Sequence, residues 1–238
     1  MIPAHPSSAE DEYWRMFQSV RGDVNVTIAS NNAYLTIHRL ATEDYSIRDK
    51  YQRAPRFWNL NTYALQTSLF ISFGRIFDKR SNSFSIQKLA DATIANPAFF
   101  SKVALRHRKR QFSQVLGADP HWLVDFINQA WEPTAADLEP LRTALTPHCD
   151  KFKAIYQPLR HKYFAHRGTE SQQAIEGLFD KTLKTDVDAI LRFLHTLLWA
   201  IREMADNGKR PDLVNFADYY REVRTVVGDI ERFIRELL

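Results

Sequence analysis

The sequence predicts an all-α fold, a helical bundle with additional helices and no significant β-sheet. Its 7 glycines against 16 phenylalanines leave few of the tight turns that β-hairpins require. Most of the chain also shows the helical period, with apolar residues recurring at steps of three and four. At 238 residues the chain is long enough to bury a full core. We therefore expect one domain over residues 1–238, with residues 1–10 as a disordered N-terminal arm.

The first half of the chain predicts one long helix followed by shorter ones. Ser7 or Ser8 can cap a helix that runs to about residue 40. Residues 22–26 are its weak point, because glycine and β-branched residues are poor helix formers. The further helices are expected over residues 58–78, from a cap at Ser85 to about Ile94, over residues 98–111, and over residues 120–131.

The second half opens with a long helix that carries a continuous apolar stripe. Thr134 and Asp137 form a pair like a capping box at its start. Pro147 and Pro158 each remove one backbone hydrogen bond and should bend the helix, and Gly168 suits its end. We expect the stripe to be core plus dimer interface; it consists of Leu138, Leu141, Leu145, Cys149, Phe152, Tyr156, Leu159 and Tyr163.

The tail of the chain predicts three more helices. His195 lies among leucines of the second one, where we expect a buried histidine with satisfied hydrogen bonds. Gly208 is suited to end that helix. The three helices are expected over residues 171–179, where Thr169 and Gln172 offer a capping box, from about residue 185 to 207, and over residues 219–238.

Composition narrows the classes of function. Cys149 is the only cysteine, so no internal disulfide and no thiolate cluster for zinc or iron–sulfur can form. The first residues lack the basic segment and apolar run of a signal peptide, and no span reaches about 18 uninterrupted apolar residues. We therefore expect a cytoplasmic protein with no membrane partner. The net charge of +4 permits a nucleic-acid partner without requiring one.

The densest set of reactive groups lies in residues 160–167. A histidine has an ordinary pKa of ~6.5 and can exchange a proton near neutral pH. An arginine can hold phosphate oxygens with two donors and neutralise developing charge. Because the ribose 2′-OH supplies the nucleophile, RNA cleavage by this set needs no metal or cofactor. Arg160 and His166 are the candidate catalytic pair, and His161 either orients a partner or carries the second proton.

Helical geometry argues against a straight helix at this site. Residues six apart lie about 240° around the axis and ~9 Å along it, so Arg160 and His166 would point apart. They converge only if the helix bends or frays, or if a second copy of the chain faces the first. The competing interpretation is a solvated helix terminus, which His and Arg favour. A metal site at His161 and His166 is not favoured, because the spacing misses the i, i+4 pairing of helical chelators.

Other charged and aromatic residues are candidates for RNA contact or support. The basic run of residues 106–110 could hold RNA phosphates or be a solvated helix face. Tyr163 and Phe164 could stack on a base, or one could be core while the other lines a dimer groove. Arg75 and Asp78, one helical turn apart, should form a salt bridge or hold the motif helix. The RNA-binding candidates are Lys162, Tyr163, Arg167, Arg106, Arg108, Lys109 and Arg110.

Residues 159–167, with the order Arg-x5-His, resemble the signature of the HEPN superfamily in its abortive-infection, AbiU-like type. Residues 69–78 and 83–86 are similar to the earlier helix of that group, and the resemblance covers about residues 11–205. It implies an α-helical domain that dimerises, whose active members are metal-independent endoribonucleases of phage-defence or toxin–antitoxin systems. The motif maps onto Arg160, His161 and His166, with His161 where the family often has Asn or Asp.

Three hypotheses follow for the function. The first is a metal-independent endoribonuclease that cleaves RNA by 2′-OH attack, acts as a homodimer, and has a cognate antitoxin as a candidate partner. The second is a non-catalytic HEPN module that binds RNA, nucleotide or a partner protein. The third is a purely structural helical adaptor.

Overall fold

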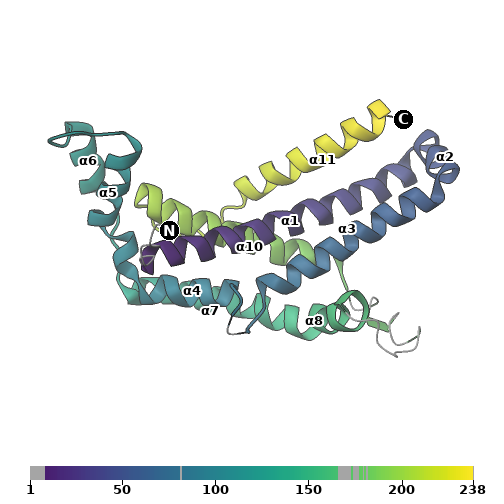
Figure 1. Cartoon of the computed structure of the whole chain (residues 1–238), viewed down its shortest axis with the longest axis horizontal. Coiled ribbons are helices and arrows are strands. Elements are labelled where there is room, and N and C mark those ends of the chain that lie inside the picture. Colours follow the sequence, from purple (N-terminus) through teal and green to yellow (C-terminus); the bar gives the residue numbers. More distant parts are fainter. Residues whose placement is uncertain are drawn as a thin grey trace, which may run out of the picture.

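The computed structural model describes residues 9–80, 82–165, 173, 177–178, 180 and 182–237. Every regular element within these residues is a helix, which confirms the all-α prediction (Figure 1). None of these helices combines the length and the apolar composition that a membrane crossing needs.

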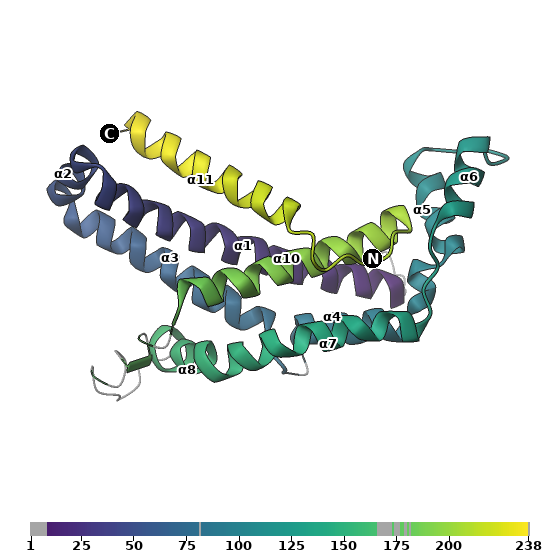
Figure 2. The same ribbon diagram turned by 180° about the vertical axis from the view of Figure 1, so that it is seen from behind.

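The first three helices form a long antiparallel pair with a short connector at its tip. α1 (Ala9–Glu43) and α3 (Pro55–Ile76) lie side by side, and α2 (Tyr45–Arg53) joins them (Figures 1 and 2). The predicted weak point at residues 22–26 does not interrupt α1, because Val20 and Val24 are buried and packing outweighs propensity. α1 begins at Ala9, so the predicted arm of residues 1–10 overlaps its first turn; residues 1–8 lie outside the described part.

The connector α2 escaped the prediction, and α3 begins earlier than expected. The carboxylate of Asp44 caps α2 by accepting hydrogen bonds from the backbone N–H groups of Ser46 and Ile47. Pro55 occupies the first turn of α3, where its missing N–H has no consequence. Short capping signals of this kind decide helix boundaries that periodicity alone leaves open.

The middle of the chain forms shorter helices, two of which project from the rest. The predicted cap at Ser85 is confirmed: its hydroxyl accepts from the Lys88 N–H at the start of α4 (Ile86–Ala95). The helix expected over residues 98–111 is divided, because Ser101 caps a new helix after the 3-10 turn. α5 and α6 stand as an arm at one end of the molecule (Figure 1). These elements are η1 (Pro97–Phe100), α5 (Lys102–Phe112) and α6 (His121–Gln129).

The next helical run is continuous but widens twice into π-helical turns. Thr134 and Asp137 form the predicted capping box at the start of α7 (Ala135–Lys151). Pro158 lies between two π-helical turns, where it removes one donor from the ladder. Pro147 lies inside α7 and does not interrupt it, so of the two predicted sites only Pro158 coincides with a change of winding. The run continues as η2 (Phe152–Tyr156), α8 (Gln157–Leu159) and η3 (Arg160–Ala165).

The last two helices match the prediction closely. α10 (Lys184–Asn207) ends at Gly208, whose left-handed φ of 57° is suited to glycine and whose N–H bonds to the carbonyl of Met204. α11 (Ala217–Leu237) packs along α1 (Figures 1 and 2). The predicted helix end at Gly168, the capping pair Thr169 and Gln172, and most of the helix over residues 171–179 lie outside the described residues.

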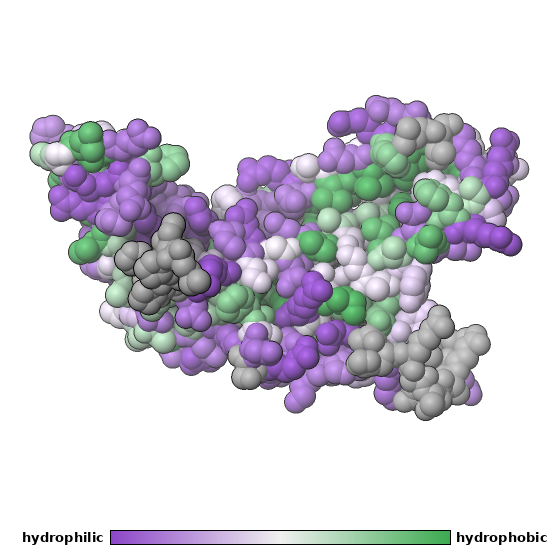
Figure 3. All heavy atoms as spheres, in the orientation of Figure 1, coloured by the Kyte–Doolittle hydropathy of each residue, from purple (hydrophilic) through white to green (hydrophobic). Residues whose placement is uncertain are grey.

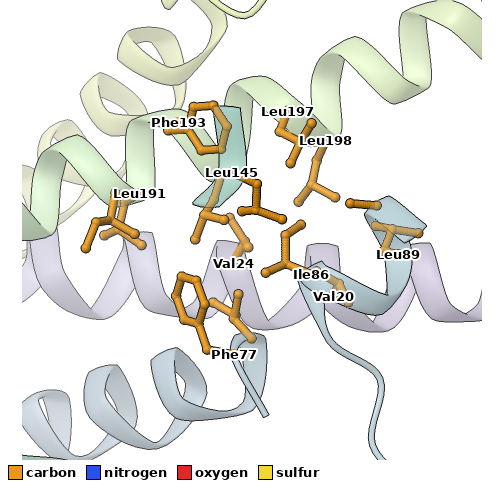
Figure 4. Packing of buried hydrophobic residues seen from close by; sticks show 14 of the residues in the cluster. Val20, Val24, Phe77, Ile86, Leu89, Leu145, Leu191, Phe193, Leu197 and Leu198 are labelled. Carbon is orange, nitrogen blue, oxygen red and sulfur yellow. The ribbon is translucent and has the colours of Figure 1, made fainter. Parts of the chain in front are cut away.

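The core fills the space between α1, α3, α4, α7 and α10. Leu145 of α7 meets Val24 of α1, Ile86 of α4 and Leu197 of α10 there (Figure 4). The predicted stripe from Leu138 to Leu159 is confirmed as core, although Cys149 and Tyr163 are only partly buried. Since the buried members of the stripe pack within one chain, a dimer has to use another surface.

The expectation for His195 is wrong in one respect. Its Nδ1 is buried and has no hydrogen-bond partner. The nearby hydroxyl of Tyr219, whose ring centroid lies 5.9 Å from the imidazole, donates to Asp188 instead. Burial lowers the pKa of His195, an effect that Glu222 and Asp218 oppose. The imidazole is therefore held in its neutral form.

Candidate active site

A groove of about 580 Å³ lies beside the motif segment. It runs between the end of α3 with the loop after it and the helical run from α7 to η3. Two residues of the predicted motif, Arg160 and His161, line it. The remaining lining residues are Gly74, Phe77, Asp78, Lys79, Arg80, Gln87, Cys149, Asp150, Phe152, Lys153 and Gln157.

Arg160 reaches this groove across Gly74 of α3. A Cβ atom built on Gly74 would lie 2.0 Å from Nε of Arg160 and 2.1 Å from its Cδ. Any other residue at position 74 would overlap with this side chain as it stands. We call the backbone surface of Gly74 the seat of Arg160, because the arginine packs directly against it. We had not predicted a role for Gly74, although a glycine inside a helical pattern often has a packing reason.

The Arg160 guanidinium has no carboxylate partner at ion-pair distance within the described residues. Its Nε is buried without a hydrogen-bond partner, and its Nη1 lies 3.4 Å from Nε2 of His161. Burial lowers the pKa of Arg160, the charge of Asp78 opposes this, and Arg80 adds repulsion. Arginine nevertheless stays charged at any physiological pH. The groove therefore contains a half-buried cation with unused donors.

The predicted salt bridge between Arg75 and Asp78 is wrong. α3 ends at Ile76, so Asp78 lies in the loop and not one helical turn beyond Arg75. Asp78 instead accepts from Arg80 at 2.6 Å, and Nη1 of Arg75 lies 3.6 Å from Asp23. The hydrogen bonds from Arg80 lower the pKa of Asp78, and the charge of Arg160 contributes. Asp78 thus acts on the motif through its charge.

The motif segment itself is π-helical from Arg160 to Ala165. π-helical turns are rare and occur often at functional sites. The angular separation of an ideal α-helix does not apply here, because each hydrogen bond spans five residues instead of four. His161 and Lys162 are exposed. His166 and Arg167 lie outside the described residues, so the geometry of the catalytic pair stays a prediction.

The two aromatic residues of the motif join it to α3. Phe164 stacks on Phe70 with ring centroids 4.5 Å apart and 15° between the planes. Tyr163 meets Phe164 edge-on, with centroids 4.8 Å apart. Both rings are partly buried against the core. Their first role is to fix the motif segment, and base stacking by Tyr163 stays a prediction.

Two lysines add unpaired positive charge to the groove. Lys79 and Lys153 are exposed, and no carboxylate of the described residues lies within ion-pair distance of either. Asp150 contributes one exposed acid. Burial raises the pKa of Cys149 to about 11, so its thiol is protonated at neutral pH and is a poor nucleophile. Among the described residues, no three His, Cys, Asp or Glu side chains cluster as a metal site.

The basic run on α5 is engaged within the chain. Arg106 and Arg110 both pair with the carboxylate of Asp119, which is 4% exposed. Arg108 binds Glu10 at 2.9 Å and the carbonyl of Ala205, so the solvated-face interpretation is wrong for it. Lys109 lies 4.9 Å above the ring of Phe126. RNA contact by Arg106, Arg108, Lys109 and Arg110 stays a prediction.

The all-helical fold agrees with the HEPN superfamily, in its abortive-infection class. The model of the HEPN family AbiU2 matches residues 8–225, and the chain therefore belongs to the AbiU2 family. Comparison with the curated proteins gave no match. Comparison with the solved structures gave none either.

Proposed function

We propose that this HEPN module is a metal-independent endoribonuclease of a phage-defence or toxin–antitoxin system. The observation that carries the proposal is Arg160, a charged guanidinium packed against Gly74 in a cation-lined groove, with no carboxylate of the described residues at ion-pair distance. A guanidinium with free donors is suited to hold two oxygens of a phosphate. Lys79 and Lys153 add charge where the flanking phosphates would lie.

The proposed reaction uses the substrate's own nucleophile. His166 takes the proton from a ribose 2′-OH, which attacks the adjacent phosphorus. Arg160 neutralises the extra negative charge of the pentacoordinate phosphorane. The bond to the 5′-oxygen then breaks, and this oxygen receives a proton. We assign this donation to His161, whose Nε2 lies 3.4 Å from Nη1 of Arg160. The products are a 2′,3′-cyclic phosphate and a 5′-hydroxyl end.

We further propose that the active form is a homodimer that uses the first half of α3. Phe57, Leu60 and Tyr63 recur there every three residues and are 58%, 67% and 44% exposed. Apolar surface gathers on the half of the molecule where α1, α3 and α11 run together (Figure 3). A second copy of this chain, which carries the same stripe, is the occupant that symmetry favours. Leu60→Glu should give a monomer by light scattering, whereas Thr143→Glu, at an exposed position of α7 outside this stripe, should not.

The first test is cleavage of a mixed RNA by the purified protein in EDTA. Wild type should cut and leave cyclic phosphate ends, and His166→Ala should not cut. Activity that disappears only on chelation would contradict the metal-free reaction. RNA binding that persists in His166→Ala, with no cleavage by wild type on any RNA, would favour the non-catalytic HEPN module.

The second test is growth on expression in cells. Wild type should be toxic, and toxicity should be lost in both Arg160→Ala and His166→Ala. Equal growth of all three at equal protein levels would count against catalysis as the origin of toxicity. Suppression of wild-type toxicity by a co-expressed neighbouring protein would identify the antitoxin.

A further inference from the structure

A second hollow, of about 450 Å³, adjoins the groove. It lies between α4 and α7, which run side by side (Figures 1 and 2). Four residues line both spaces, so the groove and the hollow are adjacent. These shared residues are Lys79, Gln87, Cys149 and Asp150.

The chemistry changes from the groove to the hollow. The hollow shares Lys79 and Asp150 with the groove, but its other charged groups are engaged within the chain: Arg142 binds Asp91 at 2.9 Å, and Lys88 donates to the carbonyl of Ser83 at 2.6 Å. Ala90 and Leu145 give it an apolar wall. Thr146 and Gln87 add neutral hydrogen-bonding groups at its edge. A groove that contains the Arg160 guanidinium, beside a hollow with an apolar wall and neutral hydrogen-bonding groups, matches the two halves of a nucleotide, its phosphate and its base.

Gln87 stands where the two spaces meet. It is half-buried, and its carboxamide oxygen has no hydrogen-bond partner. The terminal torsion of glutamine is broad, so the carboxamide can rotate to meet a ligand. A glutamine carboxamide can form two hydrogen bonds with adenine, at N6 and N7, and uracil lacks this pattern.

We propose that the hollow between α4 and α7 binds the base of a nucleotide next to the scissile phosphate in single-stranded RNA, with adenine preferred over uracil. The position of this base next to the cut rests on the proposed endoribonuclease function, whereas the binding of the base does not. A base within a duplex is stacked and paired and cannot enter such a hollow. Its volume falls in the range of small-molecule sites.

The test fills the hollow from its exposed edge. Thr146 is exposed on α7 and lines the hollow, so Thr146→Trp covers its entrance without disturbing the core. Thr143→Trp is the matched control, because Thr143 is exposed on the same helix and lines neither space. Gln87→Leu removes the proposed adenine contact. Circular dichroism melting establishes that all three variants fold.

Binding is measured first, by fluorescence anisotropy with 2′-O-methyl oligonucleotides that cannot be cleaved. Oligo-A should bind wild type several-fold more tightly than oligo-U, and Thr146→Trp should weaken oligo-A binding by about tenfold, as expected for loss of one base contact. Thr143→Trp should bind like wild type. Gln87→Leu should bring oligo-A and oligo-U to equal affinity. Equal binding of oligo-A by Thr146→Trp and wild type would overturn the proposal.

Cleavage is measured separately, by sequencing the ends produced from a mixed RNA. Wild type should show adenine enrichment at one position beside the cut, and Thr146→Trp should lose this enrichment. Cleavage by wild type with no base preference at any flanking position would overturn the subsite while the endoribonuclease function stands. Absence of cleavage together with the expected binding pattern would reject the nuclease and retain the subsite.

Discussion

Two cation-rich regions of the molecule look equivalent in sequence and differ in structure. The run on α5 holds four cations and a histidine in five residues, yet Arg106 and Arg110 share Asp119, and Arg108 is paired with Glu10. The motif groove collects its cations from three separate segments, and no carboxylate of the described residues lies at ion-pair distance from Lys79, Lys153 or Arg160. Charge density along the chain therefore does not show which cations are paired within the fold. The positions of the carboxylates do.

The largest expected effect comes from comparing the loss of one arginine in each region. Arg160→Ala removes the group that neutralises the phosphorane, and RNA cleavage should fall by about 10³-fold. Arg106→Ala removes a more exposed arginine from the α5 run and should change the rate by no more than about twofold. Single-turnover rates on one oligonucleotide measure both. Equal losses in the two variants would end the distinction between the regions.

The second prediction displaces Arg160 without deleting it. Gly74→Ala puts a Cβ where Nε of Arg160 lies, so the guanidinium has to move, and cleavage should fall by about 10²-fold. Gly22→Ala is the control, because a Cβ there meets nothing within 4 Å. It should keep full activity and raise the free energy of unfolding by ~0.5–1 kcal/mol, since alanine favours the helix. A fully active Gly74→Ala variant would show that the seat does not position the arginine.

The third prediction compares one lysine from each region. Lys153→Ala should weaken RNA binding several-fold and lower the slope of log affinity against log salt by about 0.7, the value for one phosphate contact on a single strand. Lys109→Ala should leave both quantities unchanged, because that lysine lies against Phe126 and Asn207. Salt titrations by fluorescence anisotropy measure the slope. A larger loss of RNA affinity in Lys109→Ala than in Lys153→Ala would place the RNA-binding surface on the arm of α5 and α6.

Periodicity and capping rules predicted most of this fold. The capping box at Thr134, the cap at Ser85 and the helix end at Gly208 follow from local hydrogen bonding, which depends only on neighbouring residues. The connector α2 was missed because it is only nine residues long, strongly polar, and buries a single residue, Ile47. The π-helical turns were expected only as bends at proline, since the alternative windings of a helix differ too little in sequence pattern.

The site was only half visible in the sequence. Arg160 and His161 could be placed by their motif, but the seat at Gly74 depends on how α3 crosses the motif segment. The partner of Arg75 could not be predicted either, because Asp23 lies on α1, 52 positions away in the chain. Contacts between distant segments decide which charges stay free, and a single sequence without its fold does not contain them.

The smallest expected effect comes from neutralising Asp119. It tests whether this buried carboxylate is the reason that the α5 run and the motif groove differ. Burial alone would raise the pKa of Asp119, but Arg106 and Arg110 outweigh it and lower the pKa. A carboxyl whose pKa is lower in the folded state stabilises the fold above its ordinary pKa, and this contribution is lost as the pH falls through the folded value. The free energy of unfolding of Asp119→Asn should therefore be lower than that of wild type at pH 7. The two values should converge as the pH falls below about 4.

The same variant releases two arginines on the arm. With Asp119 neutral, Arg106 and Arg110 lose their shared counter-charge and should become available to phosphates. RNA affinity of Asp119→Asn at low salt should then rise about twofold, with a steeper salt dependence and an unchanged rate of cleavage. The rate stays unchanged because the arm stands at the end of the molecule away from η3 (Figure 1). Unchanged affinity and salt slope would mean that something other than Asp119 keeps the α5 run from binding RNA.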